Sequence, residues 1–205
     1  MNDLICPADG KISQLGQISE GEIFQAKGHH FSVQDLLGID PKQADVFKEG
    51  SFLTVYLAPP DYHRVHMPMD AHLTQMIYIP GRLFSVNFKT ASRTPNLFAR
   101  NERVVTLFET SVGKMAVILV GAMIVGSMET VFAGTITPPR RKELQKWNYE
   151  HPIHFRRGEE LGRFKLGSTV IVLFEREKIV WDPCLKSTRP VKMGEKLGII
   201  RPDRW

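Results

Sequence analysis

A serine directly after a glycine opens a long apolar run near the C-terminal end of the sequence. Gly167 and Ser168 come just before residues 170–174, a run typical of a buried strand. Because Gly167 has no side chain, its carbonyl is open to attack by the neighbouring Ser168 hydroxyl. Such an attack converts the peptide bond into an ester, and it needs a strained or pre-organised peptide and a base for the hydroxyl proton. The pair therefore predicts self-cleavage between residues 167 and 168, with a histidine and a carboxylate nearby.

Two histidines and an aspartate elsewhere in the chain are candidates for the groups that such a serine needs. His63 and His66 lie three residues apart in a segment bounded by prolines, which leave no room for a helix. In an extended segment their rings point to opposite faces, so we expect them to have different roles. A metal site would need a third ligand with zinc-like spacing, which is not evident. Asp9, directly before a glycine, is either a turn residue or the acid that orients a histidine.

The elements that must position these residues read mainly as short strands. Runs of β-branched and aromatic residues predict strands at residues 11–15, 51–58, 70–79, 104–109, 114–120, 123–128 and 170–174. A short helix is expected between Ser32 as its N-cap and Gly38 as its C-terminal stop. Residues 137–157 are charged and bounded by prolines, which favours a surface excursion. The predicted fold class is therefore mainly β (α+β), with a few short helices.

Length and composition limit the kind of protein. At 205 residues, with 42% hydrophobic and 24% charged residues, the chain is expected to form a single domain, residues 1–205. Its net charge of +5 weakly favours anionic partners, but no nucleic-acid-binding motif is present, so we expect no nucleic acid. Cys6 and Cys184 lie far apart and predict neither a disulfide framework nor a zinc site. The most apolar stretch, 115–128, is too short to span a bilayer, and no signal peptide is evident, which points to the cytoplasm.

Four sequence blocks occur in the order found in one enzyme family. They are Pro-Ala-Asp-Gly at residues 7–10, Asp-Tyr-His-Arg-Val-His-Met-Pro at 61–68, Pro-Asn-Leu-Phe-Ala-Arg-Asn-Glu-Arg at 95–103 and Leu-Gly-Ser-Thr at 166–169. On these blocks the chain resembles the bacterial phosphatidylserine decarboxylase proenzymes over nearly its whole length. Members of that family usually carry a longer N-terminal portion, rich in apolar and amphipathic helix, whereas this chain starts almost at the first block.

The resemblance implies a role for each candidate residue. It makes His66 the general base toward Ser168, Asp9 the acid that orients this histidine, and His63 a group that assists the later decarboxylation. The third block is either a plain loop with a short helix or the phosphate-binding side of the pocket. Its candidate substrate-binding residues are Asn96 and Arg100, followed by Asn101 and Arg103.

The resemblance also implies a covalent cofactor. The serine ester would lose the upstream chain by β-elimination, and the dehydroalanine left behind would hydrolyse to a pyruvoyl group with release of ammonia. One chain would become a β chain, residues 1–167, and an α chain, residues 168–205. The pyruvoyl carbonyl would accept the electrons released when phosphatidylserine loses CO2 to give phosphatidylethanolamine. No metal and no diffusible cofactor are expected.

The partners implied by the resemblance are a lipid and a second chain. The substrate is phosphatidylserine, and the enzyme would lie as a peripheral protein on the cytoplasmic side of the cell membrane, against its anionic surface. The α and β chains of one precursor would stay together, and two such precursors would form a homodimer.

A short pattern, Gly-Glu-x-Leu-Gly, occurs at residues 158–162 and again at 194–198. Each copy predicts a tight turn that leads into a strand, and no other internal repeat is convincing. With the short strands around Asp9, this pattern resembles the barrel-sandwich hybrid folds, which also include lipoyl carriers and sugar-phosphotransferase domains. Two other functions therefore stay open. One is a non-enzymatic carrier or phosphotransfer domain with His63 or His66 as acceptor, and the other is a metal-dependent hydrolase that uses the same histidines.

Overall fold

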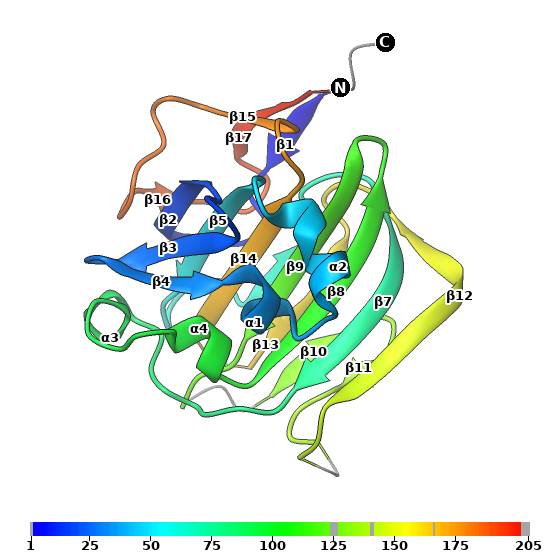
Figure 1. Ribbon diagram of the computed structural model, residues 1–205, viewed down its shortest axis with the longest axis horizontal. Coiled ribbons are helices and arrows are strands. Elements are labelled where there is room, and N and C mark those ends of the chain that lie inside the picture. The colour runs from blue at the N-terminus through cyan, green and yellow to red at the C-terminus, as the bar shows by residue number, and fades with distance from the viewer. Residues whose placement is uncertain (1, 124–126, 140–141, 166, 202–205) are drawn as a thin grey trace.

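The computed structural model describes residues 2–123, 127–139, 142–165 and 167–201 of the chain. Antiparallel strands dominate these residues, and the helices are few and short (Figure 1), which confirms the mainly β prediction. The strands are β1 (Asp3–Ile5), β2 (Gly10–Gln17), β3 (Glu22–Ala26), β4 (His29–Ser32), β5 (Ser51–Leu57), β6 (Arg64–His66), β7 (Ala71–Ile79), β8 (Arg103–Thr110), β9 (Gly113–Val120), β10 (Met128–Thr130), β11 (Gly134–Thr135), β12 (Gln145–Phe155), β13 (Glu160–Phe164), β14 (Ser168–Phe174), β15 (Ile179–Trp181), β16 (Pro190–Val191) and β17 (Lys196–Ile200). The helices are α1 (Val33–Leu37), α2 (Pro41–Ala44), the 3-10 helix η1 (Asp45–Phe47), α3 (Phe88–Ala91) and α4 (Leu97–Arg100).

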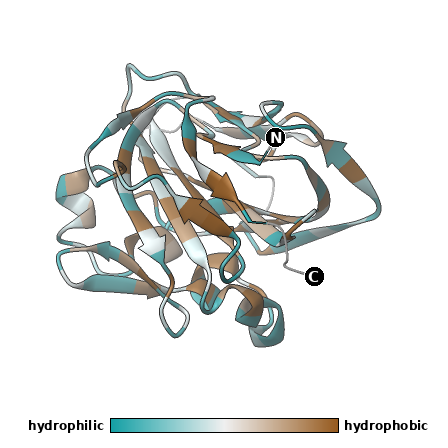
Figure 2. Ribbon diagram, turned by 90° about the horizontal axis from the view of Figure 1, so that it is seen from above, coloured by the Kyte–Doolittle hydropathy of each residue, from teal (hydrophilic) through white to brown (hydrophobic). Residues whose placement is uncertain are grey.

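An eight-stranded antiparallel sheet with the order β12-β7-β8-β9-β14-β5-β2-β16 forms the centre of the molecule. Successive residues of its strands point into two hydrophobic clusters, one on each face. On β14, Val170 and Val172 face the two smaller sheets, whereas Ile171 and Leu173 face the β3–β4 hairpin and the helices. Figure 2 shows the hydrophobic residues concentrated along the central strands, with hydrophilic residues toward the periphery. Both faces of β14 are thus covered, which explains why its sequence is a continuous apolar run.

The strand order of the large sheet is symmetric about its centre. Strands β9 and β14 lie side by side in the middle, flanked by β8 and β7 on one side and by β5 and β2 on the other. The register of β2 against β5 shifts between Ile12 and Gln14, and the register of β7 against β8 shifts between Leu73 and Gln75. These bulges occupy the same place in both strand pairs. The sheet therefore contains two copies of one three-stranded unit, related by a pseudo-twofold axis between β9 and β14.

The two smaller sheets follow the same relation. One consists of β1, β17 and β15, and the other contains β6, β13 and β10 in the equivalent positions. Leu4 on β1 lies opposite Gly198, and Val65 on β6 lies opposite Gly162. A register shift follows at the same point in both pairs. The duplication therefore extends through both layers of the fold.

Tight turns lead into the middle strand of each small sheet. Gly158 and Gly194 both have a φ of 83°, a conformation that favours glycine. The Gly158 N–H donates to the Met67 carbonyl and the Gly194 N–H donates to the Cys6 carbonyl, both at 2.9 Å. The predicted turns are confirmed. The expectation that no further repeat exists is wrong, since the strand order and register repeat. The sequence hides the repeat because the two copies share few residues outside this glycine-rich pattern, among them Asp9 and Asp70.

The second copy of the unit is inserted into the first. Strands β6 to β13 lie in sequence between β5 and β14, which are neighbours in the sheet. The equivalent strands β8 and β9 are joined by a short hairpin at Ser111 and Val112. In the first copy, by contrast, the chain leaves β5 at Leu57 and returns only at Ser168, which pairs with Leu57. The predicted cleavage bond thus lies at the crossover where the inserted copy rejoins the first.

Local expectations fared unequally. The helix between Ser32 and Gly38 is confirmed: Ser32 accepts a hydrogen bond from the Asp35 N–H at 3.0 Å, and Gly38 ends α1 in the left-handed conformation. Residues 137–157 are not a surface excursion throughout, because 145–155 form β12, the strand at the edge of the large sheet beyond β7. The strand expected at 123–128 lies partly outside the described residues, and the described strand starts only at Met128.

Candidate active site

Ser168 opens strand β14 in the interior of the large sheet. Its side chain is fully buried, and its Oγ donates a hydrogen bond to the backbone carbonyl of Val120 on β9. On the other side, Ser168 pairs with Leu57 on β5. The serine is therefore fixed between two neighbouring strands, and its hydroxyl must leave the Val120 carbonyl before it can attack the carbonyl of Gly167.

Gly167 lies against the end of β5. A Cβ atom at this position would lie 3.0 Å from the Leu57 carbonyl oxygen and 3.1 Å from the Pro59 nitrogen, so a larger residue would crowd the crossover. A small cavity of about 90 Å³ lies beside this glycine. It is lined by residues from four separate parts of the chain: Tyr56, Pro59, Ser85, Val86, Ala122, Met123 and Gly167. The cavity gives a small group access to the predicted cleavage bond.

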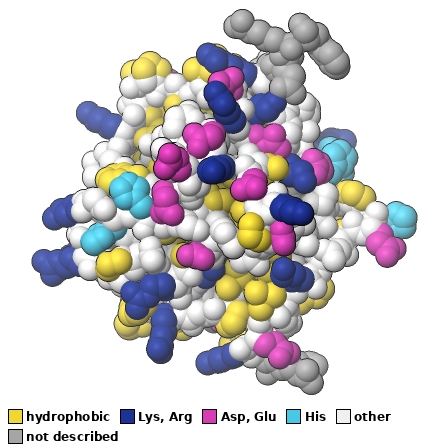
Figure 3. All heavy atoms as spheres, in the orientation of Figure 1, with side chains coloured by type: hydrophobic (Ala, Val, Ile, Leu, Met, Phe, Trp, Pro, Cys, Tyr) yellow, Lys and Arg dark blue, Asp and Glu magenta, His cyan; other side chains and the backbone are white. Residues whose placement is uncertain are grey.

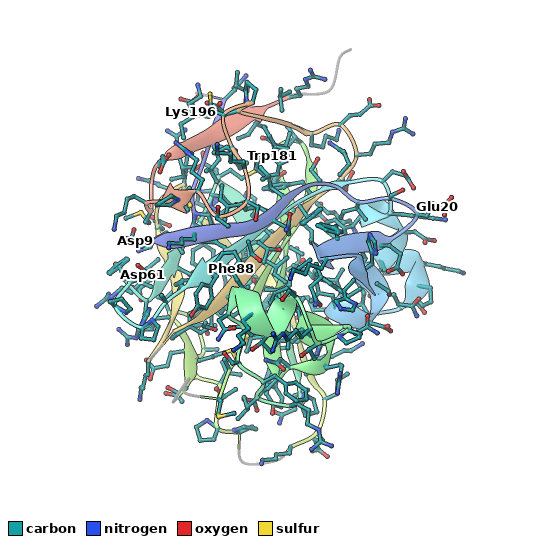
Figure 4. All side chains as sticks on the ribbon, turned by 90° about the vertical axis from the view of Figure 1, so that its left-hand side faces the viewer. Asp9, Glu20, Asp61, Phe88, Trp181 and Lys196 are labelled. Carbon is teal, nitrogen blue, oxygen red and sulfur yellow. The ribbon has the colours of Figure 1, made fainter. Side chains whose placement is uncertain are left out.

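A turn at residues 58–61 carries the chain from β5 into the histidine block. The Asp61 carboxylate accepts a hydrogen bond from the Ala58 N–H at 2.7 Å, and the Asp61 N–H donates to the Ala58 carbonyl at 2.9 Å. Figure 4 shows Asp61 next to Asp9 at one edge of the molecule. The turn thus brings the histidine block to the end of β5, where Leu57 pairs with Ser168.

His66 has a partner at each ring nitrogen. Its Nδ1 lies 2.8 Å from the Gly158 carbonyl oxygen, which can only accept, so Nδ1 carries the proton. Its Nε2 lies 3.1 Å from the Tyr62 hydroxyl, and the two rings stack with their centroids 5.7 Å apart. In the neutral imidazole, Nε2 is therefore the acceptor and holds the lone pair that a general base needs.

Asp9 lies in the turn next to His66 without a hydrogen bond to its ring. The His66 N–H donates to the Pro7 carbonyl at 2.8 Å, which joins the turn to β6. The Asp9 carboxylate accepts hydrogen bonds from Lys192 Nζ at 2.8 Å and from the Met193 N–H at 2.9 Å. Burial raises the pKa of Asp9, but these hydrogen bonds and the charge of Lys192 outweigh burial and keep its pKa below the ordinary value. Asp9 is thus an ionised carboxylate at neutral pH.

The surroundings of the His63 ring differ from those of the His66 ring. Both of its ring nitrogens are buried, and neither has a hydrogen-bond partner among the described residues. Its backbone carbonyl accepts a hydrogen bond from the Phe164 N–H at 2.9 Å, close to the point where β13 leads on toward Gly167. Buried polar atoms without a partner are uncommon in folded proteins. The two histidines therefore have different surroundings, and that of His63 suits contact with a ligand or a reacting group.

The duplication relates this site to a hollow elsewhere in the molecule. Asn2 is the equivalent of His63, because its carbonyl accepts from the Ile200 N–H on β17 as that of His63 accepts from the Phe164 N–H on β13. Asp70 is the equivalent of Asp9, because each carboxylate accepts from the backbone N–H just before the turn glycine, Gly158 or Gly194. Asn2, Asp70 and the hairpin residue Ser111 line a hollow of about 330 Å³. Its counterpart under the pseudo-twofold axis is the crossover with the predicted cleavage bond. The duplication places His63 and Asp9 on the strands and turn around this crossover, but neither lines the cavity beside Gly167. Among the described residues, no hydrogen bond joins Ser168 to His63, His66 or Asp9.

Two of the polar residues in the third block are engaged in the fold. Arg103 is buried and donates to the backbone carbonyls of Leu36 at 2.7 Å and Asn101 at 2.8 Å. Burial lowers its pKa to about 10. The buried Asn101 amide donates to the carbonyls of Phe84 at 2.9 Å and Gly121 at 2.8 Å. Since backbone groups occupy both side chains, neither is available to bind a phosphate.

The other two residues of that block, Asn96 and Arg100, are exposed at α4. Asn96 has a positive φ of 55° and starts the helix. The Arg100 guanidinium lies over the Phe84 ring, 4.9 Å from its centroid. Neither residue lines the cavity beside Gly167.

Sequence reasoning missed the residues that contact the candidate groups, among them Tyr62, Val120 and Lys192. Tyr62 lies inside the second sequence block, so its place next to the histidines was a usable signal. Val120 and Lys192 lie far along the chain from Asp9 and from each other, and only strand pairing brings them to the site.

Other features bear on the kind of chemistry. Burial raises the pKa of the Cys6 thiol to about 12, so this cysteine is protonated at neutral pH and is a poor nucleophile. No group of three or more His, Cys, Asp or Glu side chains that could hold a metal ion occurs in the part of the chain that the structure describes. Within that same part, none of the helices has the length and apolar character needed to cross a membrane.

The fold and the site together define a mainly β protein with a glycine–serine bond at a buried crossover, the arrangement expected of a self-processing proenzyme. The sequence matches the family model for phosphatidylserine decarboxylase over residues 1–199, and the chain belongs to this family. This result confirms the resemblance read from the four blocks.

Relatives from three bacterial species agree with this assignment. The chain is 59% identical to the phosphatidylserine decarboxylase proenzyme of Pseudomonas putida over 199 residues, which cover 95% of this chain and 69% of the relative. It is 58% identical over 200 residues to the proenzyme of Pseudomonas entomophila, with 96% and 69% covered. It is 55% identical over 203 residues to that of Pseudomonas fluorescens, with 97% and 70% covered.

Proposed function

We propose that this chain decarboxylates phosphatidylserine to phosphatidylethanolamine and CO2, with a pyruvoyl group that it makes from Ser168. The observation that carries the proposal is the position of the Gly167–Ser168 bond, at the crossover between the two copies of the fold and beside a cavity. The family match and the names of the relatives give the reaction and the precursor character.

The surroundings of residue 168 fit a pyruvoyl group. The nearby histidine block contains His63, whose two buried ring nitrogens have no partner among the residues that the structure describes and suit a carbonyl or a substrate carboxylate. A pyruvoyl carbonyl supplies an electron sink for the electrons that decarboxylation leaves on the substrate Cα. His63 is our candidate for proton delivery to that carbon.

His66 is the proposed general base for self-cleavage. Its Nε2 accepts the Tyr62 hydroxyl and must exchange this partner for Ser168 when it takes up the serine proton. The Ser168 hydroxyl must likewise turn from the Val120 carbonyl toward Gly167. The Asp9 carboxylate would then stabilise the imidazolium by its negative charge. Asn96 and Arg100 remain the proposed contacts for the lipid phosphate.

The fold accounts for how two chains could stay together after cleavage at residue 168. Strand β14, at the start of the proposed α chain, pairs with β5 on one side and with β9 on the other, and both belong to the proposed β chain. Strand β17 also pairs with β1 across the two chains. We propose a single catalytic domain of residues 1–205, which associates as a homodimer with the cytoplasmic side of an anionic membrane.

Intact-mass spectrometry of the purified protein tests the proposal most directly. We expect a 38-residue fragment, residues 168–205, lighter than the encoded peptide by one ammonia. Phenylhydrazine should block decarboxylation of phosphatidylserine by the wild-type protein, and a chelator should not. The Ser168→Ala variant should stay one chain and be inactive. Active wild-type protein that consists of one uncut chain with an ordinary serine at residue 168 would refute the proposal.

A further inference from the structure

The segment from residue 81 to residue 101 is unusually cationic. It contains Arg82, Lys89, Arg93 and Arg100, and it has no aspartate or glutamate. All four cationic side chains belong to exposed residues. Figure 3 shows Lys and Arg side chains together with hydrophobic ones over α3 and α4, at the lower left of that view. This part of the surface therefore carries a local positive charge that no acidic residue of the segment offsets.

Exposed apolar side chains adjoin this charge. Met123 is 72% exposed and Leu83 is 41% exposed. Gly121, two residues before Met123, lies close to Leu83: a Cβ on this glycine would lie 3.5 Å from the Leu83 side chain. Large hydrophobic side chains so exposed, rimmed by cations, are typical of a surface that contacts another phase or molecule.

The same surface borders the candidate active site. Met123 lines the cavity beside Gly167, together with Ser85 and Val86 from the cationic segment. The Phe88 ring at the start of α3 packs edge-on against Tyr56, another lining residue, with the centroids 5.7 Å apart. A molecule that lies on this surface is therefore next to the entrance that leads to residue 168.

Buried polar side chains hold the segment in place. Gln25 on β3 donates to the carbonyls of Ala91 at 2.7 Å and Thr94 at 2.8 Å, and it accepts from the Leu97 N–H at 2.9 Å. Gln25 is only 1% exposed, so these hydrogen bonds are shielded from water. These bonds fix the backbone on both sides of Arg93, between α3 and α4.

We propose that the surface formed by Arg82, Leu83, Lys89, Arg93 and Met123 docks on an anionic lipid bilayer, with Leu83 and Met123 entering its interface. We call it the docking surface. The occupant follows from two features together, a positive charge that complements anionic headgroups and apolar side chains that suit the acyl boundary. The inference rests on the proposed function for its purpose, since docking here would bring a lipid headgroup to the cavity beside Gly167.

Vesicle sedimentation tests the docking surface without any catalysis. The uncleaved Ser168→Ala chain should bind vesicles of phosphatidylcholine with phosphatidylglycerol, and it should bind pure phosphatidylcholine vesicles much more weakly. Each interfacial cation contributes about fivefold to such binding. The double variant Lys89→Gln/Arg93→Gln should therefore bind roughly twentyfold more weakly. Leu83→Ser should weaken binding at high salt as well, because its contribution is not electrostatic.

A matched control removes the same charge elsewhere. Lys42 and Lys48 are exposed at α2 and just after η1, away from α3 and α4 in Figure 1. The variant Lys42→Gln/Lys48→Gln should bind the vesicles nearly as well as its parent. If both double variants lost vesicle binding equally, binding would depend only on the net charge of the protein, and the inference would be overturned. So would unchanged vesicle binding by Lys89→Gln/Arg93→Gln and Leu83→Ser.

A second copy of the chain is the other occupant that this test can reveal. If Leu83→Ser changes the sedimentation coefficient of the free protein and leaves vesicle binding intact, the surface is a dimer interface and the docking inference is wrong. The outcome for the proposed function is separate, because wild-type activity on detergent-dispersed phosphatidylserine does not need a bilayer. If the wild-type protein bound vesicles but did not decarboxylate detergent-dispersed phosphatidylserine, the proposed function would be contradicted and the docking surface would stand.

Discussion

The turns at residues 5–9 and 66–70 are equivalent under the pseudo-twofold axis, and they show what is scaffold in this site and what is special. The two turns exchange matching hydrogen bonds: the Ile5 N–H donates to the Pro68 carbonyl at 3.1 Å, and the His66 N–H donates to the Pro7 carbonyl at 2.8 Å. Each turn also ends in an aspartate that caps a backbone N–H of the glycine turn below it. In both copies, therefore, the aspartate has the structural role of fixing the glycine turn.

The differences between the turns lie elsewhere. His66 stands where the other copy has Ile5, and His63 stands where it has Asn2. Lys192 pairs with Asp9 at 2.8 Å, which adds a charge interaction to the backbone cap. The comparison teaches that the histidines distinguish the candidate site from its counterpart, while an aspartate alone does not. Substitutions in matched pairs across the axis can separate the two kinds of role.

Among substitutions that leave Ser168 in place, His66→Ala should have the largest effect on cleavage. Without a base for the Ser168 proton, the precursor should accumulate uncut, with cleavage slowed by roughly a hundredfold to ten-thousandfold. Gel electrophoresis over time after expression measures this directly. Tyr62→Phe is the control, since it removes only the hydroxyl that occupies Nε2 and should leave cleavage largely intact. Prompt cleavage by His66→Ala would remove His66 from the mechanism.

Asp9→Asn should have the next largest effect, and Asp70→Asn is its matched control. Both changes keep an oxygen that can cap the backbone N–H, so each should cost modest stability, about 1 kcal/mol. Asp9→Asn also removes the ion pair with the exposed Lys192, which adds only a small further loss of stability. Only Asp9→Asn should also accumulate uncut precursor, because it removes the negative charge beside His66. Thermal unfolding and the cut fraction are measured on the same samples. Equal cleavage in the two variants would show that Asp9 serves only the turn.

His63→Ala should leave cleavage intact and impair the later reaction. The fragment of residues 168–205 should form as in the wild type, whereas decarboxylation of phosphatidylserine should fall by roughly a hundredfold or more, because proton delivery is lost. Asn2→Ala, at the equivalent position, should change neither step. Release of CO2 from labelled substrate gives the rate. Full turnover by His63→Ala would mean that the two histidines do not divide the work.

The sequence by itself determined the local elements and the chemical candidates. Residue types fix short-range structure directly, so Ser32 and Gly38 predicted the limits of α1, and the glycine-rich pattern predicted the turns at Gly158 and Gly194. The four blocks pointed to the family for the same reason, since each is a contiguous run whose residue types can be read without knowing the fold.

Only the tertiary structure decided which distant residues meet. The pairing of Leu57 with Ser168, the bond from Lys192 to Asp9 and the burial of Arg103 under backbone carbonyls all join segments far apart in the chain. The duplication was hidden for the same reason, because its copies share mainly backbone hydrogen bonds and few side chains besides the two aspartates. Backbone groups pair alike whatever their residue types, and so a fold can repeat after its sequence has ceased to do so.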